Sequence, residues 1–319
     1  MKMNFLEYGL GKGNEFWKYP IVLIVTFIGM GFLGAIPLLF VTGIFRRQSD
    51  GDRSWIDNMD FEAIGMSLNL GLFLMLLIFA IGLWIFLGFI KVMHGSTYKE
   101  ITNGTKKIRW NRVWVGVITW GTLMTISHLS SFIGNPSNFV FQFDVVRFIP
   151  LLLISLIFIP LQTSFEELTF RGYFAQGLAR VTRSRWVAFL VPSILFGLMH
   201  FGNPEVAEHG FWIMMPTYIL IGLVWGLVSI LDDGIELALG AHAINNVFIS
   251  LFFTYSSGAF QTYAVFEVLE INPVRSLIAI SLYSAIFVAF LSWKYKWDFS
   301  ILNKRVEIKE EENINVDTQ

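Results

Sequence analysis

The chain has 319 residues, of which 55% are hydrophobic and only 15% charged. Soluble domains carry roughly 25% charged residues, so this composition predicts an integral membrane protein in contact with membrane lipid. The net charge of −1 gives no indication of nucleic-acid binding, and we expect none. The absence of cysteine excludes disulfides, thiolate catalysis and cysteine-ligated metal.

The first half of the chain contains apolar runs separated by charged loops. Three membrane spans are predicted here, at Tyr19–Phe45, Ala63–Ile90 and Val113–Ile133. The first run is too long for a signal-peptide core and is followed directly by Arg46-Arg47, so we expect it to remain as a span. A mixed-charge loop, Arg46–Glu62, and a basic loop, Lys91–Arg112, connect the runs. Residues 1–147 thus form a predicted N-terminal transmembrane region with a basic cytoplasmic loop.

The second half contains five further apolar runs. These spans are predicted at Phe148–Leu161, Trp186–Phe201, Phe211–Leu231, Leu237–Tyr255 and Ser276–Trp293. The fourth span is expected to continue as helix to Ala179, with Pro160 bending or opening it. Loops are expected at 134–144 and 256–273. We divide this half into a core at 148–255, a loop and last helix at 256–293, and a charged cytoplasmic tail at 294–319 whose end is expected to be disordered.

The distribution of basic residues predicts the orientation of the spans. With the N-terminus inside, the inside segments hold 18 Lys and Arg residues and the outside segments hold 5. Positive charge marks cytoplasmic loops, so we expect both termini on the cytoplasmic side. The predicted fold is an all-α polytopic bundle of about eight transmembrane helices in the cell membrane. The active site is expected towards the cytoplasmic side, at that end of span four.

One charged cluster lies directly after an apolar run, in Ser164-Phe165-Glu166-Glu167-Leu168-Thr169-Phe170-Arg171. An ionisable group at membrane depth costs about 2.5–3.5 kcal/mol on insertion scales, so it needs compensation or a chemical role. Glu167 and Arg171 share a helix face at i,i+4 and are expected to pair. Glu166 lacks such a partner and is free to act as a base. The alternative is an ion-pair cluster that only anchors the helix end.

Two histidine motifs follow in later spans. Phe196 and His200 share a face at i,i+4, and so do His242 and Asn246, which lie next to small residues that permit close helix approach. The alternatives are an interfacial histidine and a hydrogen bond that only holds the bundle together. The remaining histidines are expected to be structural or incidental; they are His94, His128 and His209.

Together these residues permit two kinds of hydrolytic chemistry. Glu166 and His200 could hold and activate a water molecule, while His242 and Asn246 donate hydrogen bonds to the developing oxyanion. Alternatively, Glu166, His200 and His242 could bind Zn²⁺ and leave an open position for water. We favour no metal cofactor because Asn246 is a poor zinc ligand and a good amide donor, and we keep zinc as the alternative.

In their order and spacing, these three motifs resemble those of the CPBP family of intramembrane proteases. The family includes type II CAAX endopeptidases, Abi proteins, and proteins for bacteriocin processing and immunity. The resemblance covers about residues 148–255. It implies that Glu166 is the general base, that His200 activates the water, and that His242 and Asn246 stabilise the oxyanion. It also implies supporting roles for Glu167, Arg171 and Phe196.

The sequence therefore predicts an intramembrane endopeptidase that cleaves a membrane-associated or lipidated protein or peptide. One alternative is a non-catalytic bacteriocin immunity or membrane binding protein with the same fold. Another is a transporter that uses the buried carboxylate and imidazoles as a proton relay. No internal repeat is visible, which argues against transporters built from inverted halves.

Overall fold

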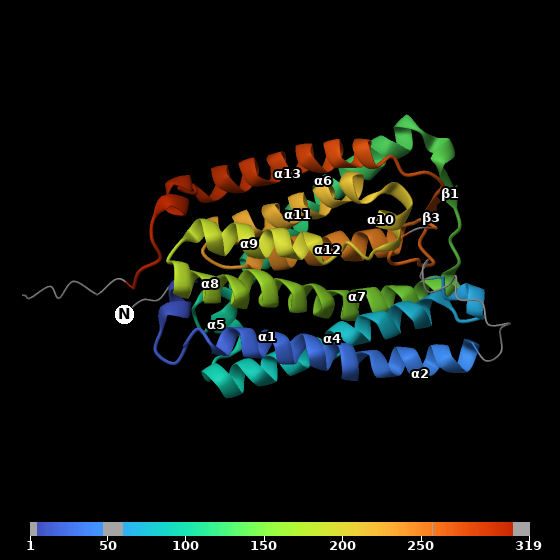
Figure 1. Cartoon of the computed structure of the whole chain (residues 1–319). Helices are drawn as coiled ribbons and strands as arrows, with labels where there is room; N and C mark the ends of the chain where they lie inside the picture. Colours follow the sequence, from blue (N-terminus) through green and yellow to red (C-terminus); the bar gives the residue numbers. More distant parts are fainter. Residues whose placement is uncertain (1–4, 47–59, 257, 309–319) are drawn as a thin grey trace, which may run out of the picture.

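The computed structural model describes residues 5–46, 60–256 and 258–308, which form a bundle of roughly parallel helices (Figure 1). It is 76% helical. Six described runs are long and apolar enough to cross a membrane: Lys18–Phe45, Leu68–His94, Trp110–Gly134, Val145–Thr182, Phe211–Leu231 and Pro273–Tyr295. Two shorter apolar helices are Arg185–Leu198 and Glu236–Phe252. The helical membrane class is confirmed, whereas eight crossings and a cytoplasmic position of both ends stay predictions.

The helices, in chain order, are α1 (Lys18–Gly29), α2 (Ala35–Arg46), α4 (Leu68–His94), α5 (Tyr98–Asn103), α6 (Trp110–Gly134), α7 (Val145–Glu167), α8 (Ala175–Thr182), α9 (Arg185–Leu198), α10 (Pro204–His209), α11 (Phe211–Leu231), α12 (Glu236–Phe252) and α13 (Pro273–Tyr295). Turns of π-helix at Met30–Gly34 and Leu168–Phe174 join α1 to α2 and α7 to α8. Local signals set some of these ends. The Ser67 side chain accepts from the Leu70 amide and caps α4, and Gly95, at a φ of 66°, ends it.

A small sheet closes one end of the bundle; two of its strands lie in predicted loops, and the third takes the last residues of the predicted span Leu237–Tyr255, whose helix ends at Phe252. Its strands are β1 (Phe139–Phe141), β2 (Phe253–Thr254) and β3 (Phe266–Val268), in the order β1-β3-β2. β1 is antiparallel to β3, with Phe139 opposite Val268, and β2 is parallel to β3. Phenylalanine recurs in all three strands, and the rings of Phe253 and Phe266 stack with centroids 6.0 Å apart. Such pairs stabilise strands too short to carry a turn signal of their own.

Both ends of the described chain lie at the opposite end of the bundle (Figure 1). Phe5 and Val306 belong to one buried hydrophobic cluster, and the Val306 amide donates to the Arg183 carbonyl at 3.0 Å. Thus the two ends lie on the same side, and its assignment to the cytoplasm stays a prediction. Most of the mixed-charge loop and the expected disordered tail end, 47–59 and 309–319, lie outside the described residues.

Glycines allow close backbone contact between two pairs of helices, α12 with α6 and α11 with α9. A Cβ atom at Gly240 would collide with the Val113 carbonyl of α6, and one at Gly116 would collide with the Leu237 carbonyl of α12. At Gly222 the same substitution would meet the Ser193 carbonyl of α9. Small residues allow such backbone contact between membrane helices, as the sequence around His242 predicted. The contacts hold α12 against α6 and α11 against α9.

A cluster of charges joins α6, α11 and α12 at the end that holds the chain termini. Arg109 Nη2 lies 2.6 Å from Glu236 Oε2 and 3.2 Å from Asp232 Oδ2. Arg112 Nε donates to the same Asp232 oxygen at 3.1 Å, and the Trp297 indole donates to Asp232 Oδ1 at 3.3 Å. Burial raises the pKa of Asp232 to about 6, and the two arginines offset only part of that effect.

Because of this raised pKa, Asp232→Asn is expected to gain stability relative to the native protein as the pH rises from about 4 to about 6. The ordinary pKa is 3.8, so the folded protein binds this proton more tightly than the unfolded chain does. The stability that the proton contributes is present below about pH 4 and is lost as the pH passes through about 6. Asparagine keeps the shape of the protonated group and does not titrate. Melting temperatures of both proteins in detergent check this, and a constant difference over the range would contradict it.

Candidate active site

The two adjacent carboxylates lie inside a 38-residue apolar helical run, Val145–Thr182, and not at the end of a shorter span. Both side chains are buried, with 9% of Glu166 and none of Glu167 exposed. Helix continues through Pro160, and the departure from α-geometry comes instead at the π-helical turn Leu168–Phe174, directly after Glu167. Turns of π-helix are frequent at functional sites. No residue pattern in the sequence predicted this turn.

Glu167 joins two helices through ionic hydrogen bonds. Arg171 Nη1 donates to Glu167 Oε1 at 2.9 Å, which confirms the ion pair predicted from their i,i+4 spacing. The same oxygen lies 2.8 Å from His242 Nδ1 of α12. Arg171 is itself held by the Gly222 carbonyl, at 3.3 Å from Nη2, and by the ring of Phe196, 3.8 Å from its Cζ. Glu167 therefore orients the imidazole of His242 as well as pairing with Arg171.

Glu166 has a different environment from its neighbour. Its Oε2 lies 3.6 Å from His242 Nε2, beyond hydrogen-bond distance, and this buried oxygen has no hydrogen-bond partner. An unpaired buried oxygen of a carboxylate costs free energy, so its persistence points to a role in chemistry. Both carboxylates thus lie beside the imidazole of His242. Glu167 is hydrogen-bonded to it at 2.8 Å, whereas Glu166 lies 3.6 Å away.

The contacts of His242 determine where its protons lie. A carboxylate oxygen only accepts, so Nδ1 carries a proton and donates it to Glu167. Nε2 then faces Glu166 Oε2 and the Asn246 amide, whose Nδ2 is 3.5 Å away. Asn246 Nδ2 also donates to Gln162 Oε1 of α7 at 3.2 Å. The amide of Asn246 and the imidazole of His242 therefore point into the same space as Glu166.

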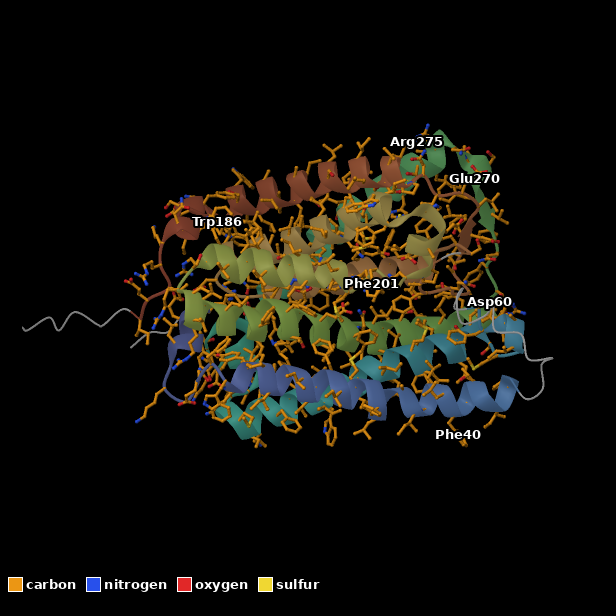
Figure 2. All side chains as sticks on the ribbon, viewed as in Figure 1. Phe40, Asp60, Trp186, Phe201, Glu270 and Arg275 are labelled. Atoms are coloured by element: carbon orange, nitrogen blue, oxygen red, sulfur yellow. The ribbon has the colours of Figure 1, made fainter. Side chains whose placement is uncertain are left out.

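His200 reaches this group through an aromatic ring. It follows the end of α9, and its Nδ1 lies 2.9 Å from the Phe196 carbonyl, which only accepts. The proton is therefore on Nδ1, and Nε2 has a free lone pair. The Phe196 ring contacts both imidazoles, with centroids 4.9 Å from His200 and 5.8 Å from His242. Phe201, next to His200, lies about midway along the bundle (Figure 2).

The structure thus groups all the predicted site residues. Glu166, Glu167, Arg171, His242 and Asn246 are in direct contact, and His200 joins them through Phe196. The sequence analysis missed the partners that other helices supply. These are Gln162 for Asn246, the Gly222 carbonyl for Arg171, and Tyr218, whose ring stacks on His200. Gln162 lies four residues before Glu166 on α7, a spacing that could have indicated it, whereas no local spacing connects Gly222 or Tyr218 to the motifs.

Among the other histidines, His209 has a buried Nε2 without a hydrogen-bond partner in the described part of the chain, whereas His94 and His128 make structural contacts. His94 bridges Asn14 and Tyr173, with ring nitrogens 2.9 Å and 2.7 Å from their oxygens. His128 Nδ1 lies 2.9 Å from the Met124 carbonyl on its own helix. Their side chains are thus engaged in packing, as expected.

Zinc was the alternative cofactor for Glu166, His200 and His242. Over the ranges 5–46, 60–256 and 258–308, no three His, Asp or Glu side chains are grouped so that they could hold a metal ion. His242 uses Nδ1 for Glu167 and Nε2 faces Glu166 at 3.6 Å. The described residues thus bring no three of these groups together as zinc ligands, and a metal-free site stays a prediction.

The fold and the site together define a polytopic helical membrane protein with a buried centre of carboxylates, imidazoles and an amide. Residues 145–248 match the family model described as type II CAAX prenyl endopeptidase Rce1-like. The chain is also 31% identical over 299 residues to the uncharacterized protein YyaK of Bacillus subtilis, with 92% of this chain and 97% of that protein aligned. It belongs to the CPBP family, the family of type II CAAX endopeptidases. No solved structure matches it.

Proposed function

We propose that the protein is an intramembrane endopeptidase that hydrolyses a peptide bond of a membrane-associated or lipidated, CAAX-like protein or peptide. The observation that carries this proposal is the difference between the two neighbouring carboxylates. Glu167 Oε1 is fixed by Arg171 and His242, although its Oε2, like that of Glu166, is buried without a hydrogen-bond partner. Glu166 lies beside the same imidazole at 3.6 Å and is not hydrogen-bonded to it. A free carboxylate next to a fixed imidazole is what a general base for water requires.

In the proposed reaction, Glu166 removes a proton from a water molecule while the water oxygen attacks the carbonyl carbon of the scissile bond. His200 accepts a hydrogen bond from the other hydrogen of that water at its free Nε2, and this hydrogen bond orients the water molecule. The protonated Glu166 then gives its proton to the leaving nitrogen as the carbon–nitrogen bond breaks. The products are a carboxylic acid and an amine, and the enzyme returns to its starting state.

His242 and Asn246 are placed to stabilise the negative oxygen of the tetrahedral intermediate. Asn246 donates from Nδ2. Because Nδ1 of His242 is committed to Glu167, His242 donates from Nε2 only when both ring nitrogens are protonated. Removing one donor from such a site costs on the order of 10²–10³ in rate.

The proposed topology has eight crossings, with both termini and the basic loops in the cytoplasm. Alternating helices and the shared position of the chain ends support it, as does the 18:5 distribution of basic residues. Phe201, next to His200, lies about midway along the bundle in Figure 2, which supports access of a substrate segment within the membrane. We propose that the site opens towards the cytoplasmic side.

The purified protein in lipid nanodiscs is expected to cleave a fluorescence-quenched peptide whose CAAX cysteine carries a farnesyl group. Activity is expected to survive dialysis against EDTA and 1,10-phenanthroline, with less than one metal ion bound per chain by mass spectrometry. Activity that is lost on chelation and restored by Zn²⁺ would refute the metal-free mechanism. If the peptide stays intact and proteomics finds no new protein termini in cells that express the enzyme, the protease proposal is wrong.

A further inference from the structure

His200 is packed against a residue outside the three motifs. The ring of Tyr218, from α11, stacks on the imidazole with centroids 4.6 Å apart and planes 20° apart. The Tyr218 hydroxyl donates to Glu205 Oε1 through a short hydrogen bond and accepts from Asn203 Nδ2 at 3.1 Å. The Tyr218 ring is thus fixed through its hydroxyl group, while one face of the ring packs on the His200 imidazole.

Glu205 is a third buried carboxylate close to the site. It lies in the first turn of α10, and only 4% of it is exposed. Its Oε1 binds Tyr218 and Asn203, whereas its buried Oε2 has no hydrogen-bond partner. Within the described part of the chain, no lysine, arginine or histidine forms an ion pair with it. Such a group costs free energy, so a role limited to the start of a six-residue helix does not explain it.

Among the described residues, these contacts leave one nitrogen of the His200 imidazole without a partner. Nδ1 is bound to the Phe196 carbonyl, the Phe196 ring lies edge-on at 4.9 Å, and Tyr218 covers one face. The only unoccupied polar atom is Nε2, the atom that the proposed reaction requires.

We propose that Tyr218 and Glu205 are positioning residues for His200: they hold its ring in one tautomer and one orientation. The inference rests on the proposed function, because it assigns His200 to the activated water. Neither residue touches the reacting atoms. Glu205 acts through the Tyr218 hydroxyl, and Tyr218 acts through its ring face.

The test combines ring-nitrogen NMR of ¹⁵N-histidine protein in nanodiscs with cleavage kinetics on the farnesylated peptide. His200→Gln assigns the signals. Wild type is expected to show two well-separated His200 ring signals, typical of one tautomer, and Tyr218→Leu to show averaged or broadened signals. Both Tyr218→Leu and Glu205→Gln are expected to lower kcat by on the order of 10- to 100-fold with KM unchanged. Tyr218→Phe, which keeps the ring and loses the hydroxyl, is expected to lie between.

Glu208→Gln is the matched control, because it removes the same charge from the exposed face of the same short helix. Unchanged His200 signals in Tyr218→Leu, or an equal effect of Glu208→Gln and Glu205→Gln, would overturn the proposal. If Tyr218→Leu does not fold, Tyr218→Phe decides, because it preserves the ring volume. If instead Glu166→Ala still cleaves the peptide, the proposed function fails, whereas the NMR measurement still reports whether Tyr218 holds His200.

Discussion

Replacing Arg171 with alanine is expected to lower the free energy of unfolding by about 3–5 kcal/mol, the usual cost of removing one partner of a buried ion pair. Arg171 is only 2% exposed. Without it, Glu167 loses its counter-ion, the Gly222 carbonyl loses its donor, and the face of Phe196 loses a stacked cation. Tryptophan fluorescence during heating in detergent measures the change.

Two further variants make the Arg171 result specific. Arg171→Lys keeps the charge but not the planar fork that binds Glu167 and Gly222 together, so an intermediate loss is expected. Arg147→Ala is the control, because its pair with Asp144 is 3.6 Å long and the two side chains are 57% and 48% exposed, and such pairs contribute about 0–1 kcal/mol. Equal melting temperatures for Arg171→Ala and Arg147→Ala would show that the buried pair does not hold the site together.

Substituting glutamine for Glu166 is expected to reduce peptide cleavage by about 10²–10⁴-fold, the usual contribution of a general base, and to leave the melting temperature unchanged. The free Oε2 of Glu166 explains the second half of this result, since no hydrogen bond is lost. Glu167→Gln is expected to lose activity and stability together, because its Oε1 serves both Arg171 and His242. Cleavage rates and melting curves of the two variants separate the roles.

The opposite outcomes also have clear meanings. Wild-type rates in Glu166→Gln would remove the general base from the mechanism. If cells that express Glu166→Ala keep a resistance phenotype of the native protein, the immunity or binding alternative is favoured. Proton-coupled uptake into proteoliposomes that depends on Glu166 would favour the transporter alternative. Equal loss of stability in the glutamine variants of Glu166 and Glu167 would contradict the difference between their environments.

The apolar runs predicted the helices because long uncharged segments have few stable alternatives in lipid. Every predicted span contains a helix, including the two that are shorter than a full crossing. The small sheet escaped prediction because two- and three-residue strands carry no periodic pattern, and their partners lie far apart in the sequence. The π-helical turn after Glu167 escaped for a similar reason, since its residues do not differ in type from those of an ordinary helix.

Within the site, spacing predicted contacts along one helix and missed those between helices. The pair of Glu167 and Arg171 follows from i,i+4 geometry alone. The bond from His242 to Glu167 could not be predicted, because it depends on the angle and depth at which α12 packs on α7. Sequence analysis therefore treated Glu167 as scaffold only. The stacking of Tyr218 on His200 was missed for the same reason, since α11 carries no charged residue to draw attention to it.

The π-helical turn at Leu168–Phe174 separates two parts of one helical run that make different contacts. Before the turn, Glu167 faces α12 and the reactive groups. After it, Gln176 donates to the Phe5 carbonyl at 3.0 Å and Arg180 donates to the Gly9 carbonyl at 3.0 Å. These hydrogen bonds hold α8 against the N-terminal segment Phe5–Gly9. A π-turn holds more residues than an α-turn and shifts the rotational phase of everything beyond it. The turn therefore lets one helical run direct Glu167 at α12 and direct Gln176 and Arg180 at the N-terminal segment.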